Sequence, residues 1–141
     1  MKIMLDKGAK MPTRAHPWDA GLDLYAPEGV GAYCIDPCGG STTIDTGVHM
    51  EIPEGYVGFI KAKSGLNVKH GLTCTGVIDA HYTGSIAVKL YNHHRCLRYD
   101  VRPGDKIAQL VILPCLLPEL ELVDSLEETD RGVGGFGSTG R

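Results

Sequence analysis

The stretch Ile86-Ala87-Val88-Lys89-Leu90 alternates large apolar side chains with a small and a charged one. This period of two puts successive side chains on opposite faces of an extended chain, so the stretch predicts a β-strand with one buried face. The same period places further apolar residues on one face of two upstream runs, namely Ile44, Val48, Met50 and Ile52, and then Tyr56, Ile60 and Ala62. Alternation is the dominant pattern of the chain, and it favours an all-β fold.

Downstream of this stretch the chain contains a continuous apolar run. Ile107–Leu113 predicts a buried strand that ends at Pro114. Glycine and proline, with 19 and 8 residues, punctuate the whole chain and indicate many turns between short elements. Many short strands joined by turns are typical of a barrel or a jelly roll. One short helix is expected at Ser64–His70, with Ser64 as its N-cap and Gly71 as the left-handed residue that ends it.

Length and charge limit the classes of protein to which the chain can belong. Its 141 residues suffice for one domain with a modest core. The net charge of -3 argues against nucleic acid as the main partner, because phosphate backbones are bound by clustered lysine and arginine. No window approaches the roughly 20 apolar residues that span a bilayer. Met1–Lys10 also lacks the apolar run of a signal peptide, so a cytoplasmic protein without a membrane partner is expected.

The five cysteines are odd in number and mostly scattered. That pattern favours free thiols in a reducing compartment over a disulfide framework. Cys34 and Cys38 have a spacing found in zinc sites, and His93, His94 and Cys96 could supply further ligands. A structural zinc site usually draws on two close cysteine pairs, however, and the sequence has one. The sequence therefore favours the interpretation that the cysteines are small buried apolar side chains.

Glycine-bearing polar segments interrupt the strands at five places. The first, Ala20–Ala26, carries Asp23 between two leucines, which an exposed strand position would also explain. The second, Ala62–Leu66, places Lys63 and Ser64 at the predicted start of the helix. Free backbone N–H groups and the positive end of the helix dipole suit such a place to an anion, although an ordinary capped helix explains it equally well.

Two later segments carry further polar residues. In Gly76–Gly84, Asp79 and Tyr82 flank a predicted hairpin turn. A carboxylate there could activate water as a general base and the ring offers a flat face for a sugar, while a turn residue is the plainer interpretation of the aspartate. In Arg102–Leu110, Gln109 stands inside an apolar run, which a ligand contact or a hydrogen bond in the core would explain.

The chain ends in the glycine-rich segment 129–141, which predicts a flexible arm because it has no means of forming a packed element. It lacks the Gly-Lys-Ser/Thr of a phosphate-binding P-loop. Arg131 suits bidentate contact with phosphate oxygens and Phe136 suits stacking on a base, whereas composition alone favours a disordered tail. The preceding residues, 1–128, are expected to form the barrel domain.

Taken in order, the five segments resemble those of the trimeric dUTPases, the deoxyuridine triphosphate nucleotidohydrolases, from Ala20 to Arg141. The most specific pieces are Gly76–Tyr82 with Gly84, and the arm Arg131–Gly140. The resemblance implies a jelly-roll-like β-barrel and a homotrimer in which each active site draws segments from all subunits. It also implies hydrolysis of dUTP to dUMP and pyrophosphate, which cleans the nucleotide pool and supplies dUMP for dTMP synthesis. Mg²⁺ would sit on the triphosphate and on waters rather than on direct protein ligands.

The resemblance also implies a role for each matching residue. Asp79 is similar to the general base that activates the attacking water, and Tyr82 to the residue that packs under the deoxyribose and rejects a 2′-hydroxyl. Asp23 is similar to the acidic residue that supports the phosphate-binding cation or metal-bound waters. The substrate-binding residues that the resemblance implies are Gly76, Val77, Ile78 and Ala87 at uracil, Phe136 over the base, Lys63, Ser64, Gly65, Gln109, Arg131, Ser138 and Thr139 at the phosphates, and Gly137 in the arm between them.

Three departures from the family pattern affect individual contacts. Lys63 stands where arginine is more usual, so a bidentate phosphate contact is lost. His81 occupies a place often filled by aspartate or glycine, and its side chain is expected to point away from that of Asp79. Thr73 and Cys74 fill a stretch where some relatives carry an asparagine that touches the base, so uracil recognition is expected to depend more on the backbone.

Two other functions compete with this interpretation. A dCTP deaminase shares the fold and a similar order of segments, but it needs a glutamate where Lys89 stands, and this chain is short for that family. The other alternative is a regulatory protein that uses the same scaffold to bind a protein partner, with Gly29–Gly40 as the segment to examine. Every candidate catalytic position is filled, which favours an active enzyme.

Overall fold

The chain folds into short antiparallel strands, as the alternation predicted. The computed structural model describes residues 1–134, and within them it contains one helix and eleven strands. The elements are β1 (Ile3–Leu5), β2 (Gly21–Tyr25), β3 (Tyr33–Ile35), β4 (Ser41–Asp45), β5 (Val48–Met50), β6 (Tyr56–Lys61), α1 (Ser64–His70), β7 (Leu72–Thr73), β8 (Thr75–Ile78), β9 (Ala87–Asn92), β10 (Tyr99–Val101) and β11 (Lys106–Pro114).

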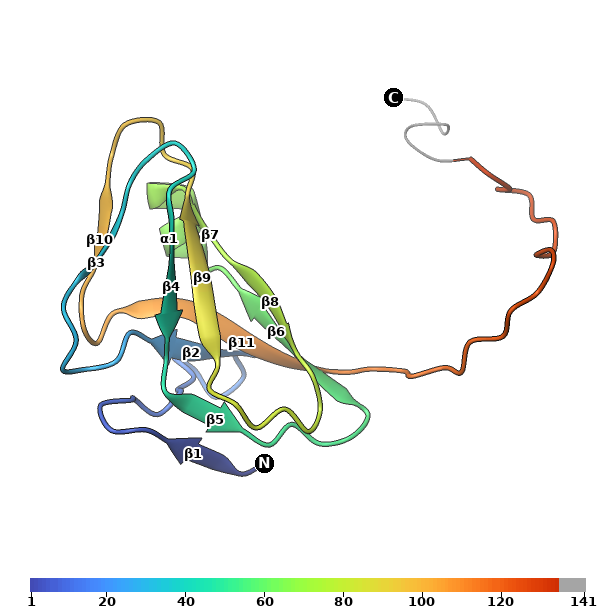
Figure 1. The fold of residues 1–141 in the computed structure, drawn as a ribbon, viewed down its shortest axis with the longest axis horizontal. Helices are drawn as coiled ribbons and strands as arrows, with labels where there is room; N and C mark the ends of the chain where they lie inside the picture. Colours follow the sequence, from blue (N-terminus) through green and yellow to red (C-terminus); the bar gives the residue numbers. More distant parts are fainter. Residues whose placement is uncertain (135–141) are drawn as a thin grey trace.

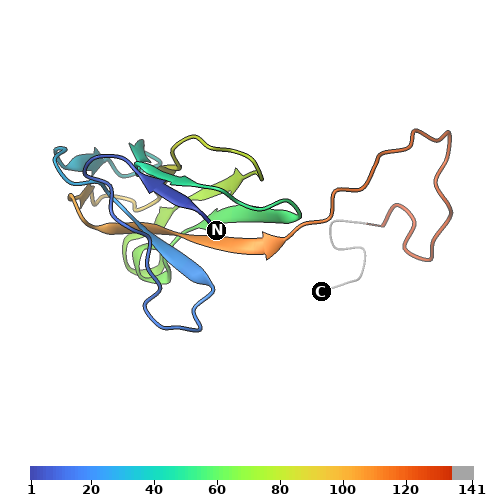
Figure 2. The same ribbon diagram turned by 90° about the horizontal axis from the view of Figure 1, so that it is seen from below.

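The strands form two larger and two smaller antiparallel sheets around one core (Figures 1 and 2). The larger sheets have the orders β2-β11-β6-β8 and β4-β9-β7, and the smaller ones are the pairs β1-β5 and β3-β10. β11 is central to the first sheet, since β2 pairs with one of its edges and β6 with the other. The result is an all-β, jelly-roll-like barrel, as expected.

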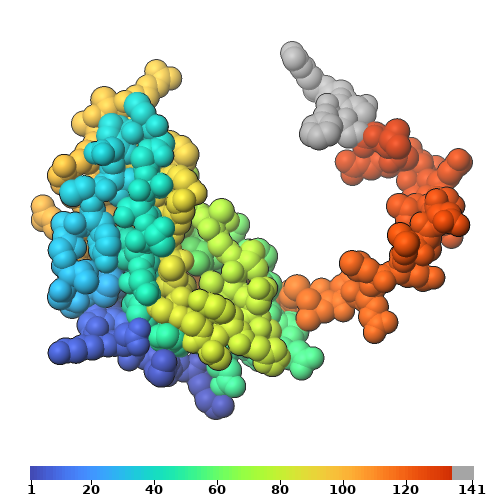
Figure 3. Space-filling view, viewed as in Figure 1, coloured from blue at the N-terminus to red at the C-terminus, as the bar shows by residue number. Residues whose placement is uncertain are grey.

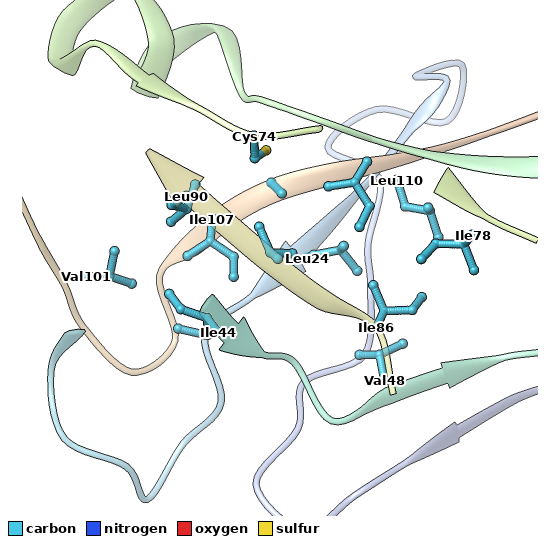
Figure 4. Packing of buried hydrophobic residues seen from close by; sticks show 14 of the residues in the cluster. Leu24, Ile44, Val48, Cys74, Ile78, Ile86, Leu90, Val101, Ile107 and Leu110 are labelled. Carbon is cyan, nitrogen blue, oxygen red and sulfur yellow. The ribbon is translucent and has the colours of Figure 1, made fainter. Parts of the chain in front are cut away.

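The core lies between the two larger sheets. Figure 4 shows apolar side chains of β2 and β11 close to those of β4 and β9. Burying one such leucine or isoleucine stabilises the fold by about 1.5–3 kcal/mol, so this cluster supplies most of the favourable free energy. The alternating sets at positions 44–52 and 86–90 are confirmed as core, the buried members being Ile44, Val48, Met50, Ile52, Ile86, Val88 and Leu90.

Two details of the strand predictions are wrong. Tyr56 was expected on a buried face, but it begins β6 at the edge of the barrel and is 45% exposed. The run Ile107–Leu113 is a strand, but it is buried only in its first half, and Leu113 is 44% exposed. The reason is that β11 runs past the core toward the C-terminal segment (Figure 1).

The predicted helix is confirmed, and so is its end. Gly71 has the left-handed φ of 67°, and its N–H donates to the carbonyl of Asn67, which closes the last turn. Ser64 is not the N-cap, which corrects the prediction. Lys63 has the extended backbone of an N-cap and makes no side-chain capping bond, so Ser64 is already the first helical residue.

The interpretation of the cysteines as buried side chains holds for Cys74 and is wrong for the pair at 34 and 38 and for Cys96, which are exposed. Burial raises the pKa of the Cys74 thiol to about 11. The exposed cysteines lie on the loops and edge strands around β3 and β10, where little packs over them. Within residues 1–134, no three His, Cys, Asp or Glu side chains gather closely enough to hold a metal ion.

Residues 115–134 contain no strand or helix and extend away from the barrel (Figures 1 and 3). This segment carries five leucines that are at least 74% exposed, namely Leu116, Leu117, Leu120, Leu122 and Leu126. Phe136, Gly137, Ser138 and Thr139 of the predicted arm lie outside the described residues. Among those that are described, no helix has the length and apolar character needed to cross a membrane.

Candidate active site

A fork between two strands lies next to the predicted catalytic residues. β7 and β9 pair at Leu72↔Asn92 and Thr73↔Tyr91. After Cys74 the chain leaves β9, so that β8 pairs with β6 while β9 pairs with β4. Figure 1 shows β8 and β9 diverging from β7 toward the loop that joins them. The strands on either side of the predicted hairpin turn therefore do not pair next to it, because they pair only at the end far from the turn.

The two prongs of the fork keep unpaired backbone. Each prong follows its own sheet because its apolar residues, such as Ile78 on β8 and Val88 on β9, are buried in the core. Within residues 1–134, the second edge of β8 has no strand partner, and neither has the corresponding edge of β9 before Tyr91. Unpaired backbone N–H and C=O groups require hydrogen-bond partners. The fork is thus suited to a planar ligand with donors and acceptors along its rim.

The loop Asp79–Ile86 closes the fork and carries both predicted catalytic residues. Its turn contains His81, whose φ of 65° is left-handed. The N–H of Tyr82 donates to the carbonyl of Asp79 at 3.3 Å, and the hydroxyl of Tyr82 donates to the carbonyl of Ser85 at 3.1 Å. The carboxylate of Asp79 is exposed, and the described residues offer it no hydrogen bond or ion pair. It is free to accept a proton beside a ring that is 46% exposed.

Little space separates the ring of Tyr82 from the backbone of Gly84. A Cβ added at Gly84 would come within 2.3 Å of the Tyr82 hydroxyl oxygen, so a larger residue there would displace the ring. His81 lies on the N-terminal side of the loop, where it lines a hollow with Met1 and Lys2. The glycine of the predicted motif therefore has a structural reason, namely the close approach of the ring.

The loop is anchored on two sides. The hydroxyl of Ser85 donates to the carboxylate of Asp45, which also accepts the N–H of Gly47 at 3.0 Å. Both bonds hold the pKa of Asp45 below its usual value, and the bond from Ser85 contributes more. On the other side, Nδ1 of His49 lies 2.8 Å from the carbonyl oxygen of Thr83. The position of the loop thus depends on β4 and β5.

A buried carboxylate organises the second group of predicted site residues. The side chain of Asp23 on β2 is 8% exposed and forms ion pairs with Lys63 and, at 2.7 Å, with Lys106. Burial alone would raise the pKa of Asp23, but hydrogen bonds from Lys106 and Lys63 outweigh it, so the pKa lies below its usual value. The same contact raises the pKa of Lys106. The two ammonium groups exceed the charge of Asp23 by one, and the carboxylate of Asp19, which lines the adjoining hollow, offsets that excess.

Replacing Asp23 with asparagine is expected to destabilise the fold by about 3 kcal/mol near neutral pH, because two ammonium groups would lose a buried partner. Since the folded-state pKa of Asp23 is lowered, its contribution is present above the carboxyl's ordinary pKa and is lost as the pH falls through the folded-state value. Urea denaturation midpoints of the two proteins, measured at one protein concentration, should therefore converge in acid. A difference that stays constant down to about pH 3 would contradict this account.

A hollow of about 420 Å³ opens beside this carboxylate. Gln109 lines it and donates from its amide to the carbonyl of Ala62 at 3.3 Å, which explains a polar side chain in an apolar strand. Gly21 leaves room for that side chain, since a Cβ there would lie 2.3 Å from Oε1 of Gln109. Ser64 and Gly65 are exposed at the start of α1. The complete lining is Ala15, Asp19, Ala20, Gly21, Asp23, Lys63, Gln109 and Val111.

The chain by itself does not bring Asp79 and Lys63 together. Ile78, which precedes Asp79, lies opposite Gly58 on β6, whereas Lys63 follows the far end of that strand. The interval from Gly58 to Lys63 corresponds to roughly 17 Å at about 3.4 Å per residue. Neither Asp79 nor Tyr82 lines the hollow beside Asp23. The predicted site residues therefore form two separate groups on one chain.

Sequence reasoning missed three contributors to these groups. Lys106 lies in a segment that was noticed, but its contact with Asp23 depends on the pairing of β2 with β11. His49 and Asp45 hold the loop through packing between distant segments. No short-range pattern indicates such contacts, because strand register follows from the whole fold.

The barrel carries an exposed carboxylate at an open strand fork and a separate hollow beside Asp23 that bears Lys63, an arrangement that suits an enzyme with a planar and anionic ligand. The sequence profile of the dUTPase family matches residues 7–140. The deoxyuridine 5'-triphosphate nucleotidohydrolase of Leifsonia xyli subsp. xyli is 44% identical over 134 residues, which cover 93% of this chain and 86% of that protein. The chain belongs to the dUTPase family.

Solved structures agree with this assignment. The dUTPase of Staphylococcus bacteriophage 80alpha with dUPNHPP superposes with a TM-score of 0.89 at 34% identity, covering 99% of this chain and 98% of the phage chain. A point variant of the dUTPase from phage phi11 of S. aureus, described as coordinating a structural Mg(II) ion, gives a TM-score of 0.79 at 31% identity, with coverages of 90% and 98%. Sequence and fold thus indicate the same family.

Proposed function

We propose that this enzyme hydrolyses dUTP to dUMP and pyrophosphate. The observation that carries the proposal is the fork, whose unpaired backbone edges stand beside the free carboxylate of Asp79 and the ring of Tyr82. Membership of the dUTPase family supports it, as does the nucleotide analogue bound by the phage 80alpha neighbour. In the cytoplasm the reaction would remove dUTP from the nucleotide pool and supply dUMP for dTMP synthesis.

The base is proposed to enter the fork and pair with its backbone. Uracil presents an acceptor, a donor and a second acceptor along one edge, which backbone N–H and C=O groups can complement. These groups would come from Gly76, Val77 and Ile78 on one prong and from Ala87 on the other. Cytosine replaces one acceptor with an amino group and the N–H with a bare nitrogen, so the same groups would be left unpaired. A close-fitting fork would also leave no room for the methyl group of thymine.

Tyr82 and Asp79 are proposed to act on the sugar and the α-phosphate. The ring of Tyr82 packs under the deoxyribose, where a 2′-hydroxyl would collide with it. Asp79 takes a proton from a water molecule, and the water oxygen forms a bond to the α-phosphorus. The bond from that phosphorus to the bridging oxygen breaks on the opposite side, and the electron pair leaves with pyrophosphate.

The hollow beside Asp23 is proposed to hold the triphosphate. Lys63 would contact phosphate oxygens while Asp23 keeps its ammonium group in place, and Ser64, Gly65 and Gln109 would assist. As a point charge, Lys63 would bind without the two parallel hydrogen bonds of an arginine. The ammonium groups of Lys63 and Lys106 favour this placement over one for the base.

In this arrangement Mg²⁺ would bind to the triphosphate of the substrate rather than to protein side chains. Asp23 already faces two ammonium groups, so the hard oxygen ligands that the ion prefers would come from the triphosphate and from water. When bound there, the ion supplies neutralisation of phosphate charge. The residues of the hollow hold the triphosphate in either case, and Asp79 handles the proton.

The active form is proposed to be a homotrimer with shared sites. On one chain Asp79 follows Ile78, which pairs with Gly58 near the start of β6, whereas Lys63 follows the other end of that strand, so a site that needs both would draw them from different chains. The exposed leucines between positions 116 and 126 also require cover, which a neighbouring copy would provide. The arm 129–141 would close over a site between the other two subunits, with Phe136 on the base and Arg131, Gly137, Ser138 and Thr139 at the phosphates.

The competing functions receive less support. Lys89, which stands where a deaminase needs a glutamate, is exposed on β9 with its ammonium group 5.2 Å from the ring of Tyr91. Its positive charge cannot replace a carboxylate in proton transfer. The family match likewise favours hydrolysis over deamination. No feature of the segment Gly29–Gly40 favours a protein partner.

Pyrophosphate release from dUTP, dTTP, dCTP and UTP, measured side by side with magnesium, tests the proposal. We expect kcat/KM for dUTP to exceed the other values by about 10³-fold or more, since a site that pairs with one base edge rejects others strongly. Ammonia should not appear from dCTP. Equal rates on dUTP and UTP would contradict the role of Tyr82, and ammonia release would favour the deaminase.

A further inference from the structure

A chain of hydrogen bonds connects the N-terminal region to the loop that carries Asp79 and Tyr82. His49 on β5 is its centre. Nδ1 of His49 lies 2.8 Å from the carbonyl oxygen of Thr83, and Nε2 lies 3.1 Å from Oδ2 of Asp6. The N–H of Asp6 in turn donates to the carbonyl of Gly47 at 2.8 Å, which ties it to the turn before β5. The imidazole thus bridges two segments that are far apart in the sequence.

The bridge is the external support of the first part of the loop. Within residues 1–134, no other hydrogen bond reaches positions 79–84 from outside the loop. The far end is held by Ser85, which donates to Asp45, and by Ile86, whose N–H donates to the carbonyl of Val48 and whose carbonyl accepts from Thr46. Thr83 directly follows Tyr82, so a shift of its carbonyl would move the ring. A displacement of about 1 Å in a catalytic group can lower a rate by up to about 10²-fold.

The chemistry of both partners favours the charged imidazole. The carbonyl of Thr83 and the carboxylate of Asp6 can only accept, so both ring nitrogens must carry hydrogen if both bonds are to form. Two hydrogen bonds raise the pKa of His49, and the bond to the carbonyl of Thr83 contributes more than the bond to Asp6. The other charged groups around it are Asp45 from β4, and Lys2 and Glu51, which pair with each other at 2.9 Å and line the same hollow.

We infer that His49 is a positioning residue for the hydrolysis, which holds the carbonyl of Thr83 so that Tyr82 and Asp79 keep their places at the fork. Its kinetic part rests on the proposed function, whereas its structural part does not. The bond to Thr83 is the one that matters for the rate, and Asp6 fixes the ring that makes it.

Two substitutions at this position separate the bonds. Asparagine places an amide N–H near the position of Nδ1, and glutamine places one near that of Nε2. His49→Asn is therefore expected to keep the bond to Thr83 and a kcat within about twofold of the wild type, whereas His49→Gln loses that bond and about 10-fold in kcat. His70→Gln, at an exposed histidine at the end of α1 whose ring lies 4.9 Å from that of Tyr99, is the matched control and should change neither kcat nor the exchange of the loop.

Amide hydrogen exchange without substrate gives a readout that is independent of activity. His49→Gln is expected to speed exchange in the peptide that covers residues 79–86, and His49→Asn and His70→Gln are not. In the wild type both bonds form below the raised pKa of His49. As the pH rises through that value, the ring keeps one N–H for two acceptors, and because the carboxylate of Asp6 is the stronger acceptor, the bond to Thr83 is the one that weakens. The wild-type kcat should therefore decline over that range relative to the profile of His49→Asn, which lacks the titrating group.

The outcomes distinguish the two proposals. If the wild type hydrolyses dUTP and His49→Gln matches it in kcat and in exchange, the inference about His49 is wrong and the proposed function stands. If His49→Asn loses as much kcat as His49→Gln, the bond to Thr83 is not the relevant one and the inference is overturned. If the wild type leaves dUTP intact, the proposed function fails, and the exchange experiment still decides whether His49 holds the loop.

Discussion

The Asp79→Asn variant is expected to hydrolyse dUTP with a kcat about 10³-fold below that of the wild type, because an amide cannot take a proton from the attacking water. The same change should leave the denaturation midpoint almost unaltered. The carboxylate is exposed and makes no hydrogen bond or ion pair within residues 1–134, so the folded state loses no contact. Continuous pyrophosphate release and urea denaturation of both proteins are the measurements.

An exposed aspartate far from the fork provides the control. Asp36 lies in the turn between β3 and β4, and Asp36→Asn removes the same charge from the chain. It should retain the wild-type kcat, which would show that overall charge is not the cause. A variant at Asp79 that keeps more than about a hundredth of the wild-type kcat would contradict the assignment of a general base, since that role is worth about 10²-fold or more.

The all-β fold could be predicted because it depends on a local property. Alternation such as that in Ile86–Leu90 predicts which side chains face the core, and this prediction does not depend on which strand lies next to it. The end of the helix at Gly71 was predictable for the same reason, since a left-handed residue is a local requirement. Local rules were less accurate at the ends of elements. Tyr56 and Leu113 are exposed there, although the sequence pattern predicted that they would be buried.

The arrangement of the site was harder to predict because it depends on strand partners. The sequence placed Asp79 and Tyr82 on a hairpin, but the partner of each strand is chosen by the packing of Ile78 and Val88 in different sheets. The ion pairs of Asp23 likewise follow from the register of β2 against β11. Register is fixed by long-range packing, and a single sequence does not show it.

The proposed sharing of sites between chains predicts that removal of the C-terminal arm greatly lowers the activity. A chain that ends before residue 129 is expected to fold, because the last strand ends at Pro114 and the core lies within the barrel. Its kcat/KM for dUTP should be about 10²-fold or more below that of the full chain, since the arm would supply phosphate contacts and a stacking surface. Gel filtration and urea denaturation would show that the truncated protein still assembles.

Mixing the two inactive variants tests whether the missing parts come from different chains. The Asp79→Asn chain has an intact arm, and the truncated chain has an intact Asp79. If the arm and Asp79 of each site come from different subunits, an equal mixture that is unfolded and reassembled together should regain activity in about a quarter of its sites, half of them having Asp79 and half of those an arm. This is far above the activity of either variant alone.

The size of the recovery identifies the architecture. Were each site built from the Asp79 and the arm of one chain, every site in the mixture would lack one of them, and activity would stay at the level of the separate variants. Mixing preformed oligomers without unfolding gives the matching control, because subunits that do not exchange cannot complement each other. A mixture that stays inactive although gel filtration shows mixed trimers would contradict shared sites and require Asp79 and the arm to act within one chain.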